Sequence, residues 1–162
     1  MAESSMPLPE RKHPAHHPAI DSNNRSIILF VTVCTEGRTP WLANKHAQQA
    51  LNRAWLRSTN WIVGKYVILP DHIHLFCAPG VYPRTELKRW IAYWKRQVTI
   101  EMRTTCPDFK WQRDFWDTQL RRGNSFSEKW AYVQNNPVRH QLTGAAQDWP
   151  YQGELNALQW HD

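Results

Sequence analysis

The stretch Tyr66-Val-Ile-Leu-Pro-Asp-His-Ile-His-Leu-Phe-Cys-Ala-Pro79 consists of two apolar runs joined by Pro70-Asp71, a pair typical of tight turns. Such runs predict two consecutive strands, over residues 61–69 and 72–78. Side chains alternate between the two faces of a strand, so we expect His72 and His74 on the same face. Two imidazoles held in this way can bind one metal ion or one phosphate group. A single histidine near a sheet is usually structural, but the ring nitrogens of a buried pair need partners.

The segments on either side of this hairpin alternate between helical and extended patterns. β-branched and aromatic residues predict a strand over 26–35, and apolar spacing predicts helices over 44–58 and 85–103. We expect a fourth strand over 109–121 and a last helix from Asn124 or Ser125 to Asn136, because proline at 137 disfavours helix before it. From Gln147 onward the chain is expected to pack irregularly against the body. This order predicts an α+β fold: a ferredoxin-like, four-stranded antiparallel sheet with helices on one face, plus the C-terminal helix.

Composition fits one globular domain. The chain has 162 residues, of which 41% are hydrophobic and 21% are charged. We expect residues 1–24, which lack a periodic apolar pattern, to form a flexible arm, and residues 25–162 to form a single domain. No apolar run approaches the ~20 residues that cross a bilayer, and the first ten residues do not resemble a secretory signal. Three widely spaced cysteines favour a reducing compartment, so a cytoplasmic location is expected.

Charge and aromatic content favour nucleic acid as a partner. The net charge is +6, the pI is about 9.5, and the chain has ten tryptophans. Cations bind phosphates and flat rings stack on bases, although we expect most of the tryptophans to fill the core. The basic residues for which we predict DNA contacts lie on the second helix and near the last one: Lys88, Arg89, Lys95, Arg96, Arg121, Arg122 and Arg139.

A second constellation lies on the last helix. Tyr132 and Asn136 are four residues apart, so they share one face of that helix. From the helical spacing alone, side-chain packing accounts for Tyr132, and termination of the helix before Pro137 accounts for Asn136.

Together the motifs resemble a known family. His72-Ile-His74, the later Tyr132 and Asn136-Pro-Val-Arg-His-Gln-Leu142 resemble the single-tyrosine HUH transposases of the IS200/IS605 group, and within them the REP-associated tyrosine transposases. The resemblance spans about residues 26–152, because it also includes Trp111-Gln112, Phe115-Trp116-Asp117 and Asp148-Trp-Pro-Tyr151.

The resemblance implies a reaction and a set of roles. It implies that Tyr132 is the nucleophile, that His72 and His74 bind a divalent metal ion, Mg²⁺ or Mn²⁺, and that Asn136 is the third ligand where many relatives have glutamine. The implied substrate is single-stranded or hairpin, REP-like DNA. It would be cleaved and rejoined through a covalent 5′-phosphotyrosine, by a monomer or a homodimer.

Three functions are therefore weighed. The first is a metal-dependent tyrosine transposase, which is an endonuclease and a strand transferase. The second is a non-catalytic regulatory protein derived from such a transposase, which would bind nucleic acid without cleaving it. The third, a zinc-dependent hydrolase, is disfavoured because no further histidine, cysteine or carboxylate stands at an obvious ligand spacing near the pair.

Overall fold

The computed structural model describes residues 27–80, 85–120 and 123–158. The arm expected over residues 1–24 lies outside the described residues, and so do Arg121 and Arg122. Within them the chain forms one antiparallel sheet of five strands in the order β4-β1-β3-β2-β5. The strands are β1 (Ile28–Cys34), β2 (Trp61–Ile68), β3 (His72–Pro79), β4 (Trp116–Leu120) and β5 (Gln152–Glu154).

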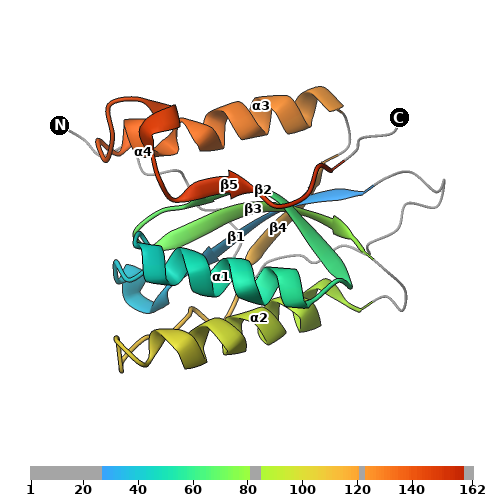
Figure 1. Cartoon of the computed structure of the whole chain (residues 1–162). Helices are drawn as coiled ribbons and strands as arrows, with labels where there is room; N and C mark the ends of the chain where they lie inside the picture. Colours follow the sequence, from blue (N-terminus) through green and yellow to red (C-terminus); the bar gives the residue numbers. More distant parts are fainter. Residues whose placement is uncertain (1–26, 81–84, 121–122, 159–162) are drawn as a thin grey trace.

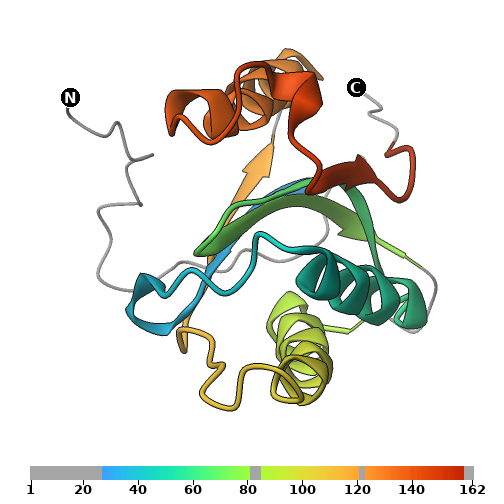
Figure 2. The ribbon, with the colours of Figure 1, turned by 60° about the vertical axis from the view of Figure 1, so that its left-hand side comes forward.

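Helices cover both faces of this sheet (Figures 1 and 2). One face carries α1 (Lys45–Arg57) and α2 (Leu87–Met102), and the other carries α3 (Gly123–Gln134) and the short α4 (Asn136–Arg139). Two 3₁₀ turns, η1 (Glu36–Arg38) and η2 (Ala146–Asp148), lie in the connections. None of the described helices combines the length and the apolar character that a membrane span requires.

The alternation along β3 divides the interior into two cores. Ile73, Leu75 and Cys77 belong to the larger core, which the sheet shares with α1 and α2. Phe76 points to the other face, where its ring packs against Phe126 and Trp130 of α3 with centroid separations of 4.8 and 6.1 Å. By the same period of two, His72 and His74 face the α3 side of the sheet. The predicted shared face of the two histidines is therefore confirmed.

The predicted ferredoxin-like α+β fold is confirmed, with three differences. The sheet gains a fifth strand, β5, which pairs with β2 where irregular packing was expected; three residues are too few to show an alternation in the sequence. Only residues 116–120 of the fourth predicted strand are extended in the sheet, because buried Phe109 and Trp111 fill the larger core from an irregular segment. Helices cover two faces instead of one, because α3 crosses to the far side.

The last helix ends earlier than expected. α3 stops at Gln134, and α4 then begins at Asn136 with Pro137 in its first turn. Proline is tolerated there because the first backbone N–H groups of a helix have no intrahelical partner. The break at Asn135 lets the chain turn back over the end of α3.

Six of the ten tryptophans are buried: Trp55, Trp61, Trp90, Trp94, Trp111 and Trp149. This confirms that most of them serve packing.

A close backbone approach at the end of β3 provides a test of the fold. A Cβ on Gly80 would lie 1.9 Å from the carbonyl oxygen of Thr59, whereas a Cβ on Gly144 would meet nothing within 4 Å. We expect Gly80→Ala to lower the free energy of unfolding by about 1–3 kcal/mol, as overpacking does. Gly144→Ala is the matched control and should leave it unchanged. Urea denaturation measures both, and equal stabilities would contradict the tight contact.

Candidate active site

The two histidines lie side by side under the α3–α4 layer. β1 fixes their places, because Cys34 pairs with His72 and Thr32 pairs with His74 in the antiparallel register. Their side chains are almost fully enclosed, with exposed fractions of 4% and 2%. The ring centroids are 4.8 Å apart and the ring planes are nearly perpendicular.

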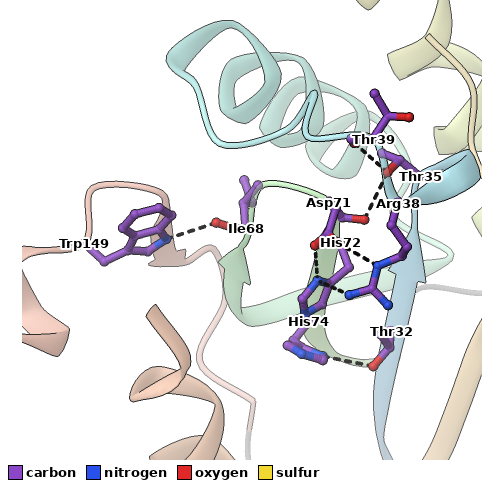
Figure 3. A network of polar contacts seen from close by, with 9 residues as sticks. All are labelled: Thr32, Thr35, Arg38, Thr39, Ile68, Asp71, His72, His74 and Trp149. Atoms are coloured by element: carbon purple, nitrogen blue, oxygen red, sulfur yellow. Dashed lines mark hydrogen bonds and ion pairs between the residues drawn. The ribbon is translucent and has the colours of Figure 1, made fainter. Parts of the chain in front are cut away.

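The Nδ1 atom of each ring lies within hydrogen-bond distance of a neighbouring polar group (Figure 3). His72 Nδ1 lies 2.6 Å from Asp71 Oδ1, and His74 Nδ1 lies 2.9 Å from Thr32 Oγ1. A carboxylate accepts hydrogen bonds and does not donate them, so Nδ1 of His72 carries the proton and Nε2 keeps the lone pair. Nε2 of His74 is buried and has no hydrogen-bond partner among the described residues. A buried polar atom without a partner is costly, and a ligand at this point would remove that cost.

Arg38 completes the support of His72. Its Nε donates to Asp71 Oδ2 at 2.9 Å, so Arg38 acts on His72 through the Asp71 carboxylate. Its Nη2 lies 3.3 Å from His72 Nδ1, which carries a proton and does not accept from it. The Arg38 backbone has a φ of 55°, in the left-handed region that few residues other than glycine adopt. The ion pair with Asp71 holds the side chain of this strained residue against the site.

The protonation states follow from burial and from the nearby charges. Burial lowers the pKa of His72, although the Asp71 carboxylate acts in the opposite direction. Burial also holds the pKa of His74 well below its ordinary value, and the charges of Lys129, Arg38 and Arg139 add to this effect. Burial would raise the pKa of Asp71, but the hydrogen bonds from His72 and Arg38 lower it to about 2. Both imidazoles are therefore neutral near pH 7, which is the form that binds metal ions.

The α3–α4 layer brings the other candidate residues to this face. Tyr132 lies near the end of α3 with 41% of its surface exposed, whereas Asn136 is fully buried at the start of α4. Asn136 Oδ1 accepts a hydrogen bond of 3.1 Å from Arg139 Nη2. The positive charges of Lys129 on α3 and Arg139 on α4 act on His74 and lower its pKa, after the larger effect of burial.

The predicted DNA-binding residues do not gather at this site. Lys88, Arg89 and Arg96 are exposed on α2, which covers the opposite face of the sheet. Lys95 is partly buried; its Nζ donates to the backbone carbonyl of Gln112 at 2.7 Å, and burial lowers its pKa to about 8. Lys95 therefore ties α2 to the irregular segment before β4. Of the predicted DNA-binding residues that the structure describes, Arg139 is the one that lies beside Tyr132.

Sequence reasoning missed four residues that surround the histidines: Thr32, Arg38, Asp71 and Lys129. Asp71 directly precedes His72, and a carboxylate beside a candidate ligand was a usable signal. Thr32 and Arg38 lie more than thirty residues from the pair, and only the β1–β3 register brings them close. Lys129 has its Nζ 5.2 Å from the centroid of the Phe30 ring, which in turn stacks on His74.

The depressed histidine pKa values predict a dependence of stability on pH. Because the folded pKa lies below the unfolded one, the unfolded chain binds more protons as the pH falls below about 6.5. The stabilisation is complete above that pH and is lost as the pH falls toward the folded pKa. We expect the free energy of unfolding, measured in EDTA, to decrease between pH 7 and pH 4.5, and to decrease less steeply in His74→Gln. Equal slopes in the two proteins would contradict a buried, neutral His74.

Comparison of the sequence with known proteins gives two findings. No family model matches the chain. A protein of Haemophilus influenzae that bears the name of a REP-associated tyrosine transposase is 34% identical over 95 residues, which cover 52% of this chain and 53% of that protein. The chain thus spans about half the length of the curated relative that it matches.

Solved structures give the corresponding result for the fold. A REP-associated tyrosine transposase bound to a REP hairpin superposes with a TM-score of 0.61 and 23% identity, over 79% of this chain and 76% of that one. A transposase structure from Deinococcus radiodurans gives a TM-score of 0.49 and 13% identity, over 68% of this chain and 91% of that one. The sequence match and the first of these folds together confirm that the chain resembles the REP-associated tyrosine transposases.

Proposed function

We propose that the chain is a metal-dependent tyrosine transposase that cleaves and rejoins single-stranded or hairpin DNA. The observation that carries the proposal is the histidine pair: both Nδ1 atoms are engaged, Nε2 of His74 is buried without a described partner, and Tyr132 lies on the helix above. The likeness to REP-associated tyrosine transposases supports the reaction class.

The donor set fits a divalent cation. His72 and His74 would hold it through Nε2, and Asn136 is the proposed third ligand. Among the described residues no third histidine, cysteine or carboxylate forms a metal-binding group with the pair, so water or a DNA phosphate would supply the remaining ligands. Neutral imidazole and amide ligands leave the charge of Mg²⁺ or Mn²⁺ largely uncompensated. Such an ion supplies Lewis-acid polarisation of a phosphoryl oxygen.

Tyr132 would carry the covalent step. Its phenolic oxygen gives up its proton and attacks the phosphorus atom, the bond from phosphorus to the 3′ oxygen breaks, and the released 3′ oxygen takes up one proton, so that no net proton is gained or lost. The product is a 5′-phosphotyrosine and a free 3′-hydroxyl end. Because this link conserves the phosphodiester, the hydroxyl of a second strand can displace Tyr132 without an external energy source.

The packing of α3 supports action within one chain. Val133 is fully buried against the sheet, and Phe126 and Trp130 contact Phe76 of β3, the strand that carries both histidines. We therefore propose that Tyr132 serves the histidines of its own chain, whether the protein is a monomer or a homodimer.

Basic residues away from the histidine face would bind the DNA outside the reacting strand. Lys88, Arg89 and Arg96 are exposed on α2 and are proposed to contact backbone phosphates from the opposite side of the sheet. The second candidate function, a regulatory protein that binds DNA without cleaving it, shares this surface. Covalent adduct formation separates the two.

The nucleophile can be tested by removing one oxygen atom. Tyr132→Phe should abolish the covalent DNA adduct on a denaturing gel, because the ring remains and only the attacking atom is lost. DNA affinity should stay within about twofold, since little binding surface changes. Tyr93→Phe is the matched control, because Tyr93 is equally exposed, at 41%, on the other side of the sheet, and it should form the adduct normally. An adduct that survives in Tyr132→Phe would refute the assignment. DNA binding by the wild type without any adduct would favour the regulatory protein.

The metal role is tested on the histidines. His72→Ala with His74→Ala should lower the Mn²⁺-dependent cleavage rate by at least ~100-fold, since several kcal/mol of charge stabilisation are lost. Mn²⁺ binding, followed by isothermal titration calorimetry without DNA, should disappear as well. His46→Ala, on α1, is the control and should retain both. Unchanged Mn²⁺ binding in a folded double variant would remove the pair from the metal site.

A further inference from the structure

Arg139 makes several contacts with the two candidate residues of the α3–α4 layer. Its guanidinium carbon lies 3.8 Å from the centroid of the Tyr132 ring. Its Nη2 donates to Asn136 Oδ1 at 3.1 Å and also to the backbone carbonyl of Tyr132. We infer that Arg139 is a positioning residue, which fixes the Tyr132 ring and the Asn136 amide in one arrangement. This inference rests on the proposed function.

The chemistry of the guanidinium makes these contacts interdependent. The guanidinium is planar, and its N–H donors have fixed directions within the plane. The Tyr132 ring lies against its face and the Asn136 amide lies at its edge, so neither can rotate without disturbing the other. Attraction between a cation and an aromatic face contributes to holding the ring. Among the described residues, no stacking partner and no hydrogen bond of the hydroxyl fixes the half-exposed Tyr132 ring. The arginine is therefore the described contact that restricts it.

The helix break explains why this residue can reach Tyr132. α3 ends at Gln134, and the last carbonyl groups of a helix lack intrahelical partners. The backbone N–H of Asn135 still bonds to the Ala131 carbonyl, at 3.3 Å. The next carbonyl, that of Tyr132, receives the Arg139 side chain, which α4 carries back over the end of α3. The guanidinium thus caps the same turn from which the phenol projects.

The same contacts argue against the DNA-phosphate role that the sequence suggested for Arg139. A phosphate-binding arginine offers its donors to solvent. Here Nη2 is already used twice, by Asn136 Oδ1 and by the Tyr132 backbone carbonyl. Arg139 should therefore affect the rate of reaction more than the affinity for DNA.

The test compares Arg139→Lys and Arg139→Gln with Arg57→Lys, a matched change of an exposed arginine on α1. Lysine keeps the charge but lacks the planar fork. We expect both changes at 139 to slow adduct formation at saturating DNA by about 10- to 100-fold, the scale of loss for a misplaced reacting group. The dissociation constant for a single-stranded REP-like hairpin, and its salt dependence, should stay unchanged. Circular dichroism and urea denaturation establish that the variants fold.

Two results would overturn the inference. If Arg139→Lys restores the full rate, only the charge matters. If the loss appears as weaker binding, with the slope of log K against log salt reduced by roughly 0.7–0.9, Arg139 contacts a phosphate instead.

A second readout does not depend on cleavage. With 3-fluorotyrosine at position 132, the ¹⁹F resonance of the metal-free protein should shift in Arg139→Lys and Arg139→Gln, and stay in place in Arg57→Lys. An unmoved resonance in the variants at 139 would contradict the ring contact. If the wild-type protein forms no adduct, the proposed function fails, and the ¹⁹F measurement still decides whether Arg139 fixes the ring.

Discussion

The register between β1 and β3 is the constraint on which the candidate site depends. Opposite residues in this pair are Thr32 and His74, and Cys34 and His72. Because side chains alternate with a period of two, a slip of one residue would turn both imidazoles into the larger core beneath α1 and α2. The register is strongly determined, since β1 and β3 are buried on both faces along most of their length. A stable apolar sheet thus holds two polar rings in a fixed orientation.

The electrostatics around the rings follow from that placement. Burial keeps the imidazoles neutral, and the charges of Arg38, Lys129 and Arg139 lower the pKa of His74 further. Asp71 is the carboxylate that acts on His72, and the same carboxylate is neutralised in part by its ion pair with Arg38. The surroundings are therefore net positive, which suits a phosphodiester more than a neutral substrate.

The two layers of helices have different tasks. α1 and α2 pack on the larger core and stabilise the sheet, whereas α3 covers the smaller core through a few apolar side chains and carries Tyr132 to the histidine face. The C-terminal segment supports the same side: Trp149 is buried in the smaller core and donates from Nε1 to the Ile68 carbonyl at 3.0 Å (Figure 3). Trp149 thus links the chain after α4 to the end of β2, next to the turn that leads into β3.

The sequence by itself determined the hairpin at Pro70-Asp71, the shared face of the two histidines and most of the helices, because these depend on local turn chemistry and on the periods of apolar residues. The order of its motifs resembles that of the REP-associated tyrosine transposases, and it was this resemblance, not the spacing of the two residues, that pointed to Tyr132 and Asn136. The sequence did not show that β5 joins the sheet, that helices cover both faces or that Lys95 serves packing. Thr32 and Arg38 reach the histidines, and Arg139 reaches the Tyr132 ring, only through tertiary structure. The register of distant strands and the turn of the chain at Asn135 decide these contacts, and no local pattern encodes them.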